Sequence, residues 1–250
     1  MIQLENVTFT YNRSEEKGNL KNINLSIRQG EVILLCGESG CGKTTLTRLI
    51  NGLIPWYYEG ELNGIVKVDG KEIREQPLHI LSRKIGSVFQ NPRSQFFNVD
   101  TTSEIAFSCE NRGLPDDEIR ERIHQTVSLF QIENLIDRNI FHLSGGEKQK
   151  IACASVSAGE PEIFVLDEPS SNLDVAAIED LKHIISCWKS AGKTVIIAEH
   201  RLYYLMELAD RIIYMQNGEI RREWTTADFL GLSQREVENL GLRRASLKQI

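Results

Sequence analysis

A glycine-rich loop near the start of the chain carries the clearest chemistry in the sequence. Gly37-Glu-Ser-Gly-Cys-Gly-Lys43-Thr44 fits the pattern GxxxxGK(S/T), between a buried strand and a helix. Such glycines let backbone N–H groups curl around phosphate oxygens, and the helix start adds a favourable dipole. We expect Lys43 to reach the β- and γ-phosphates of a nucleotide and the Thr44 hydroxyl to bind Mg²⁺. By itself the loop predicts only an NTP-binding protein, and an ordinary glycine-rich turn is the alternative. The nucleotide-binding candidates here are Gly37, Glu38, Ser39, Gly40, Cys41, Gly42, Lys43, Thr44 and Thr45.

Two carboxylates follow a second buried strand. Residues 163–166 are apolar, and Asp167 and Glu168 come directly after them. Open α/β sheets bind ligands at the carboxyl ends of their strands. We therefore expect Asp167 to hold Mg²⁺, directly or through water, and Glu168 to polarise the water that attacks phosphorus. A helix-capping Asp-Glu-Pro turn is the alternative.

Two further polar side chains follow predicted strands. Gln90 comes after strand 85–89, and Glu199-His200 comes after strand 194–198. At the same sheet edge as Asp167, Gln90 can touch Mg²⁺ or the attacking water, and His200 can bond the γ-phosphate. Either residue alone would more often be structural. Three strand ends and one glycine-rich loop at a single edge favour catalysis, with Gln90, Glu168 and His200 as catalytic candidates and Thr44, Gln90 and Asp167 as metal ligands.

A serine followed by two glycines begins another candidate segment. Leu143-Ser-Gly-Gly-Glu-Lys-Gln-Lys150 predicts a helix whose first turn offers bare N–H groups to an anion. In one chain of this size, the helix start after the glycine-rich loop and the helix start after Ser144 cannot easily bind the same γ-phosphate. We therefore expect this segment to face the nucleotide of a second chain, arranged head to tail. A simple Ser N-cap with glycine flexibility is the alternative. The residues concerned are Ser144, Gly145, Gly146 and Glu147.

The elements that must position these residues alternate between strand and helix around a helical middle. Alternating apolar and polar residues predict antiparallel strands at the start, and continuous apolar runs predict buried parallel strands. Asp69-Gly70 and Asn217-Gly218 predict hairpin turns. The predicted strands are 2–11, 20–27, 31–36, 64–69, 85–89, 163–166, 194–198, 211–215 and 219–222, with a loop over 12–19. The predicted helices are 43–53, 103–109, 116–130, 145–158 and one capped by Asp174, and the tail after Trp224 is helical in character.

This order of elements predicts an α/β fold: a P-loop NTPase (RecA-like) core with an antiparallel β subdomain and a helical insert. We expect a single domain over residues 1–250. In it, 1–91 and 160–250 would form the core with its antiparallel β subdomain, and 92–159 would form the helical subdomain with the Ser-Gly-Gly segment.

Composition further limits the functions and cellular locations that fit the chain. The 250 residues carry a formal net charge of -6, with lysine and arginine spread along the chain, which argues against a dedicated nucleic-acid binder. The start lacks the features of a signal peptide and no apolar run can cross a bilayer, so we expect a soluble chain that reaches a membrane through a partner.

Five cysteines without CxxC or Cys/His clusters predict a reducing compartment and no zinc site. A redox role is one interpretation of Cys41, and an incidental small residue is the preferred one.

Together these residues make the chain resemble the nucleotide-binding domains of ABC transporters over nearly its whole length. The glycine-rich loop looks like Walker A, and 163–168 looks like Walker B. Leu143 to Gln149 resembles the LSGGQ signature, with Glu147 in place of the usual glutamine. Gln90 matches the Q-loop, Asp174 the D-loop and His200 the switch histidine, and Tyr11 falls where the family carries an aromatic residue that stacks on adenine.

The resemblance implies ATP and Mg²⁺ as ligands and ATP hydrolysis coupled to transport. It also implies a second cassette, identical, paralogous or fused in tandem, at the cytoplasmic face of the membrane. Residues 88–95 and 143–149 look like energy-coupling-factor ATPases, which drive uptake of vitamins and of metal ions such as cobalt and nickel. That subfamily implies transmembrane coupling and substrate-binding subunits, and no nucleic acid is expected.

The sequence leaves two rival functions open. One is a soluble ABC ATPase that acts on nucleic acid or ribosomes. The DNA-repair type needs a long coiled coil between Walker A and the signature, and none fits between Thr44 and Leu143, whereas the translation type usually carries two cassettes in one chain. The other rival is a regulatory module that does not hydrolyse ATP. The presence of Glu168 and His200 argues against it.

Overall fold

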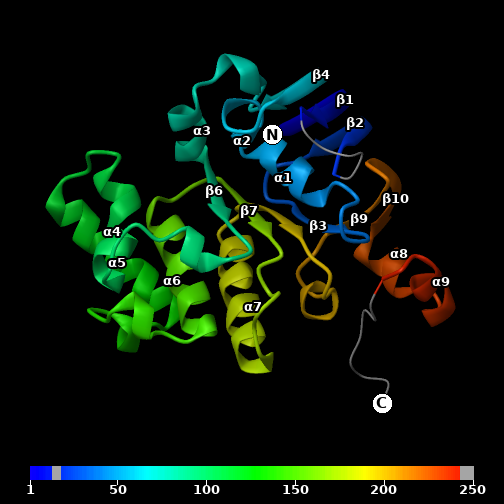
Figure 1. Cartoon of the computed structure of the whole chain (residues 1–250). Helices are drawn as coiled ribbons and strands as arrows, with labels where there is room; N and C mark the ends of the chain where they lie inside the picture. Colours follow the sequence, from blue (N-terminus) through cyan, green and yellow to red (C-terminus); the bar gives the residue numbers. More distant parts are fainter. Residues whose placement is uncertain (13–17, 243–250) are drawn as a thin grey trace.

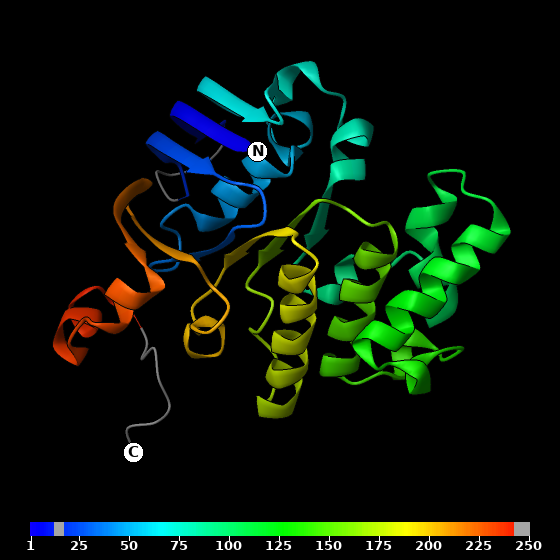
Figure 2. The same ribbon diagram turned by 180° about the vertical axis from the view of Figure 1, so that it is seen from behind.

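The computed structural model of the chain describes residues 1–12 and 18–242. The molecule contains two sheets and a helical lobe, which comprises the helices between residues 101 and 158 (Figure 1). The view from behind shows the green helices of this lobe beside the yellow α7 (Val175–Ser190) (Figure 2). The predicted loop over 12–19 falls largely on residues 13–17, which lie outside the described residues. The last part of the predicted helical tail, 243–250, also lies outside them.

The first sheet is antiparallel and contains the start of the chain. Its order is β2-β1-β4-β5. Burial alternates along β1 and β2 except where the pairing register shifts, so that the buried positions skip from Leu4 to Val7 and from Leu20 to Ile23. The predicted strand 64–69 begins earlier, at Gly60, because β1 is long enough to pair with the whole segment as far as Tyr11. The strands are β1 (Ile2–Tyr11), β2 (Leu20–Ile27), β4 (Gly60–Val68) and β5 (Lys71–Glu72).

The second sheet forms the centre of the molecule and has the order β10-β9-β3-β8-β7-β6. Neighbouring strands are parallel from β9 to β6, and β10 is antiparallel to β9. The predicted hairpin between them is confirmed, with Asn217 and Gly218 at φ 54° and 83°. The strands are β3 (Val32–Cys36), β6 (Ile85–Val88), β7 (Ile163–Asp167), β8 (Thr194–Ala198), β9 (Arg211–Gln216) and β10 (Glu219–Thr225).

Helices begin and end where the local chemistry places them. The predicted helix 43–53 stops at Ile50, because Gly52 adopts φ 79° and a separate short helix follows it. Asp100 and Asp174 cap the helices after them by accepting backbone N–H bonds from Ser103 and Ala177. The helices are α1 (Lys43–Ile50), α2 (Leu53–Trp56), α3 (Leu78–Lys84), α4 (Thr101–Glu110), α5 (Asp116–Phe130), α6 (Gly145–Ala158), α7 (Val175–Ser190), α8 (Thr226–Leu230) and α9 (Gln234–Asn239).

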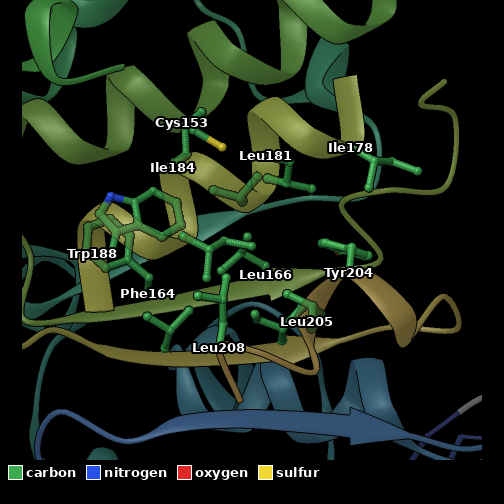
Figure 3. Packing of buried hydrophobic residues seen from close by; sticks show 14 of the residues in the cluster. Cys153, Phe164, Leu166, Ile178, Leu181, Ile184, Trp188, Tyr204, Leu205 and Leu208 are labelled. Carbon is green, nitrogen blue, oxygen red and sulfur yellow. The ribbon is translucent and has the colours of Figure 1, made fainter. Parts of the chain in front are cut away.

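The central sheet is buried on both faces. Along β3, Leu34 belongs to the cluster shared with α6 and α7, whereas Leu35 belongs to the cluster shared with α1 and the antiparallel sheet. Figure 3 shows the first cluster, in which side chains of β7 face those of α7. There the rings of Phe164 and Trp188 stack with their centres 4.0 Å apart. Continuous apolar strands are therefore confirmed as the centre of an α/β core.

Gly86 sets how closely the helical lobe lies against the core. A Cβ atom at this position of β6 would lie 2.3 Å from Val156 Cγ1, on α6, and 2.8 Å from Pro161 Cγ. Only a residue without a side chain lets α6 pack at this distance from the sheet.

We expect Gly86→Ala to lower the free energy of unfolding by about 1–3 kcal/mol, because the added methyl group overpacks the contact with α6. Urea denaturation of the two chains measures the difference. Val156→Ala in the same chain removes one of the two clashing groups and should recover part of the loss. Equal stability of the Gly86→Ala and unchanged chains would contradict this account of the packing.

Candidate functional site

The carboxyl ends of four parallel strands bring the predicted site residues to one edge of the central sheet. Leu35 pairs with Ala198, which in turn pairs with Asp167, and Leu166 pairs with Val88. The glycine-rich loop follows β3, Gln90 follows β6, Glu168 follows β7 and His200 follows β8. The structure therefore brings together the residues that the sequence placed at separate strand ends.

The glycine-rich loop is wrapped around the buried ammonium group of Lys43. Lys43 is 4% exposed, and its Nζ donates to the carbonyl oxygens of Gly37 and Glu38 at 2.9 and 3.0 Å. A Cβ atom on Gly37 would lie 2.2 Å from the Met215 carbonyl oxygen, so this turn requires glycine. The loop is thus held in shape by its own lysine, with the start of α1 directly after it.

Thr44 and Asp167 meet beside this loop. The Thr44 hydroxyl donates to Asp167 Oδ1 at 3.1 Å. Burial raises the pKa of Asp167, and the Thr44 bond opposes this only partly. A hydroxyl, a carboxylate and the nearby amide oxygen of Gln90 are hard ligands of the kind that Mg²⁺ prefers. The described residues contain no group of three His, Cys, Asp or Glu side chains that could hold a metal.

Both carboxylate oxygens of Glu168 are occupied. His200 Nε2 lies 2.9 Å from Oε1, and Gln90 Nε2 donates to Oε2 at 3.1 Å. The backbone of Glu168 adopts φ 46°, an unfavourable conformation for this residue type, and its N–H donates to Ala198 O at 2.8 Å. Three strand ends therefore meet at the Glu168 carboxylate. When His200 or Gln90 moves away, the freed carboxylate oxygen can accept a proton from water.

Glu199 is the site residue that sequence reasoning missed. It is 2% exposed and accepts four hydrogen bonds. Oε1 takes the backbone N–H groups of His200 and Arg201, at 2.7 and 3.1 Å. Oε2 takes the Ser170 N–H at 3.3 Å and the Tyr204 hydroxyl at 3.0 Å. Glu199 thereby connects two segments, the loop that contains His200 and the turn after Glu168. In the sequence, its only signal was its position as a charged residue at the end of an apolar strand.

Ser144 and the two glycines after it open α6 as predicted. Ser144 Oγ accepts the Glu147 N–H at 3.2 Å, and Glu147 Oε2 accepts the Ser144 N–H at 2.8 Å, which is a capping box. The simple N-cap is therefore part of the structure. Within the described residues, the N–H groups of Gly145 and Gly146 have no hydrogen-bond partner.

The two glycines have different surroundings. A Cβ atom on Gly146 would lie 2.7 Å from Ala177 Cβ on α7, so glycine here allows helix packing. A Cβ atom on Gly145 would find nothing nearer than Asn172 O at 3.7 Å. Gly145 also borders a cavity of about 370 Å³ between the Gln90 segment and the loop before α7. Ser144 and Gly145 are exposed, so this helix start faces outward.

Tyr11 and Cys41 lie around the glycine-rich loop. The Tyr11 hydroxyl lies 3.2 Å from Thr45 Oγ1 and accepts a bond from Arg48 at 3.1 Å, while its ring meets Phe9 edge to face. Contact of this ring with adenine stays a prediction. Burial raises the pKa of Cys41, with Lys43 opposing it less strongly, so the helix start does not produce a reactive thiolate.

Comparison with known sequences identifies the family. Residues 20–171 match the family model described as ABC transporter. A putative ABC transporter ATP-binding protein of Treponema denticola is 52% identical over 250 residues, which cover all of this chain and 51% of the relative. Another, of Pyrococcus horikoshii, is 42% identical over 229 residues, covering 91% of this chain and 80% of the relative. The chain spans about half the length of the Treponema relatives it matches.

Solved structures of similar shape agree with the predicted fold class. CbiO1 of Clostridium perfringens, part of the ABC transporter complex CbiONQ, superposes with a TM-score of 0.82 at 29% identity, covering 95% of this chain and 94% of CbiO1. The cassette MJ0796, solved as a dimer bound to ADP and Pi after hydrolysis, gives 0.78 at 29% identity, covering 90% of this chain and 99% of MJ0796. The α/β fold with antiparallel and helical parts is therefore confirmed.

We expect Asp167→Asn to raise the melting temperature of the nucleotide-free chain at pH 7 by a few degrees. The pKa of Asp167 is raised on folding, so its charged form is penalised at every pH above that pKa, and an amide avoids the penalty. As pH falls through the folded pKa, Asp167 is protonated and the difference between the chains should shrink. Thermal unfolding at neutral and acid pH measures both effects, and a lower melting temperature at pH 7 would contradict the prediction.

Proposed function

Because the chain belongs to the ABC transporter family as an ATP-binding cassette, we propose that it hydrolyses ATP to power a membrane importer of the energy-coupling-factor type. The observation that carries the ATPase proposal is the meeting of Lys43, Asp167, Glu168 and His200 at one sheet edge. ATP is the substrate in this proposal, and Mg²⁺ is bound with it by Thr44, Asp167 and Gln90.

The glycine-rich loop supplies the phosphate cradle. Its backbone N–H groups and the first turn of α1 face the phosphates, and Lys43 exchanges the carbonyl oxygens of Gly37 and Glu38 for phosphate oxygens. Mg²⁺ held by Thr44, Asp167 and Gln90 would supply positive charge against the phosphates. Gly37, Glu38, Ser39, Gly40, Cys41, Gly42 and Thr45 are the loop residues proposed to line the nucleotide, with Tyr11 against its base.

Glu168 is the proposed general base. In the nucleotide-free chain, His200 and Gln90 hold its two oxygens at 2.9 and 3.1 Å. A γ-phosphate offers His200 a more strongly charged acceptor, and a released Glu168 oxygen can then accept the proton of the attacking water. Glu199 acts through His200, because it fixes the backbone on which that side chain stands.

The outward-facing start of α6 is proposed to complete the site of another cassette. Figure 1 places α6 in the helical lobe and α1 at the centre of the molecule. The free N–H groups of Gly145 and Gly146, with Ser144 and Glu147, are donors for the nucleotide that a facing chain holds. Asp174 lies at the start of α7, beside this surface. The partner cassette is a second copy, a paralogue or a fused neighbour.

A groove of about 660 Å³ leads from the nucleotide site to exposed aromatic side chains. Thr44 and Asp167 line one part of it, and Tyr57 and Phe97, which are 71% and 75% exposed, line another. Its position beside Gln90 supports docking of a helix from a membrane subunit, which would report nucleotide state to the transporter. Among the described residues, no helix is long and apolar enough to cross a membrane. Because the chain belongs to the ABC transporter family, we propose that it works at the cytoplasmic face, bound to membrane subunits.

The importer type is supported by similarity. CbiO1 is part of a CbiONQ complex, and it covers 95% of this chain at a TM-score of 0.82. The segments around Gln90 and Ser144 look like those of energy-coupling-factor ATPases. We propose a transmembrane coupling subunit and a substrate-binding membrane subunit as partners, with a vitamin or a metal ion as cargo.

Glu168→Gln tests the ATPase proposal. We expect turnover to fall about 100-fold or more, because the amide cannot accept the proton of the attacking water. The same chain should bind ATP with Mg²⁺ and form dimers that light scattering detects. Glu162→Gln, at the exposed opposite end of β7, is the matched control and should keep full activity. Unchanged hydrolysis in the Glu168→Gln chain would remove Glu168 from this role.

Tyr57→Ser tests the docking surface. We expect the amount of chain retained by membranes that contain its partner subunits to fall about 10-fold, since exposed aromatic residues often dominate interfaces. Leu230→Ser removes a side chain that is 53% exposed, on α8 rather than in the groove, and should not change retention. Equal retention of the Tyr57→Ser and unchanged chains would place the membrane partner elsewhere.

A further inference from the structure

We propose that Arg138 is a positioning residue of the two-chain nucleotide site: it neutralises Glu147 so that the start of α6 can accept the nucleotide of a partner cassette. The inference rests on the proposed function, in which α6 faces a nucleotide held by another chain. It concerns a residue outside all the motifs that identify the family in this chain.

Glu147 places a carboxylate in the first turn of α6. Its Oε2 accepts the Ser144 N–H at 2.8 Å, and its Oε1 lies 3.2 Å from Arg138 Nη1. The bond from the Ser144 backbone, together with the Ser144 hydroxyl and the nearby Arg138 charge, keeps the pKa of Glu147 below its usual range. Glu147 is therefore ionised at neutral pH.

An ionised Glu147 creates a conflict at this helix start. Its negative charge favours the helix itself, because it meets the positive end of the helix dipole. The same turn offers its free Gly145 and Gly146 N–H groups to the phosphates of a nucleotide, which also carry negative charge. Repulsion between these charges grows when the facing chain excludes water from the contact.

Arg138 is built to resolve this conflict. Its backbone is fixed on both sides by the fully buried Thr101: the Thr101 N–H donates to Arg138 O at 3.0 Å, and the Arg138 N–H donates to Thr101 Oγ1 at 3.2 Å. The Arg138 side chain therefore extends from a fixed backbone position; it is 42% exposed, and its guanidinium group lies beside Glu147. A charge at this distance offsets that of Glu147 without blocking the glycine N–H groups.

Two lysines close to Glu147 in the sequence have other partners. Lys148 is 4% exposed and its Nζ donates to the carbonyl oxygens of Leu143 and Phe141. Lys150 pairs with Asp180 on α7 at 2.6 Å. Within the described part of the chain, Arg138 is thus the cation that pairs with Glu147.

A glutamine at position 147 would need no such compensation. It keeps the capping box, which accepts Glu or Gln at this position, but it carries no charge. Arg138 and Glu147 should therefore act as a coupled pair: loss of the arginine matters only while the carboxylate is present.

The test is a double-mutant cycle in the Glu168→Gln chain, which traps the ATP-bound dimer. Half-maximal dimerisation is measured by light scattering against ATP concentration with Mg²⁺. We expect Arg138→Gln to raise that concentration about fivefold or more at low salt, and by less at high salt, where exposed charges are screened. With Glu147→Gln also present, Arg138→Gln should change it by less than about twofold.

Arg122→Gln is the matched control. Arg122 pairs with Glu118 at 2.7 Å in the same helical lobe and reaches Ala158 O, at the opposite end of α6 from Glu147. This variant should change dimerisation by less than about twofold in either background. Thermal unfolding of every variant shows that the chains compared are folded.

The inference would be overturned if Arg138→Gln had the same effect in chains with Glu147 and in chains with Glu147→Gln. The arginine would then act on the nucleotide or the fold directly. No effect in either background would overturn it as well. The reference Glu168→Gln chain separates these results from failure of the proposed function. If that chain forms no ATP-dependent dimer, the two-chain site itself is wrong and the role of Arg138 falls with it.

Discussion

Parallel pairing of β3, β8, β7 and β6 is the constraint on which the rest of the structure depends. Because the strands run in one direction, every chemically active strand end reaches the same edge of the sheet. Lys43, Glu168 and His200 come from positions far apart in the sequence, yet they meet there. The apolar clusters on both faces hold the register of the strands and, through it, the geometry of the site.

Hydrogen bonds at this edge turn the strand ends into a single unit. Glu199 receives four donors and ties the loop after β8 to the turn after β7. A buried carboxylate is favourable only when it is satisfied in this way. Glu168 lies between His200 and Gln90, and Thr44 bonds Asp167, so the resting site holds its reactive groups in bonds that a nucleotide can replace.

The helical lobe presents the helix start that we propose completes the nucleotide site of a second chain. The start of α6 leaves the N–H groups of Gly145 and Gly146 unpaired and directs Ser144 outward. Gly86 and Gly146 let α6 lie close to β6 and α7, which fixes where this helix start is presented. Packing inside one chain thus determines where the first turn of α6 is presented to a facing chain. The Arg138–Glu147 pair adjusts the charge of that surface.

The sequence by itself determined the elements and the chemistry that local spacing encodes. The glycine-rich loop, the buried strands, the Ser144 cap and the two hairpin turns were predictable, because each depends on residues a few positions apart. Helix ends such as Ile50 and strand starts such as Gly60 needed the neighbouring element. Only the tertiary structure decided that Gln90 and His200 share Glu168, that Glu199 joins two loops, and that Arg138 pairs with Glu147. Periodicity shows which residues are buried, but it does not specify which strand ends or loops become neighbours.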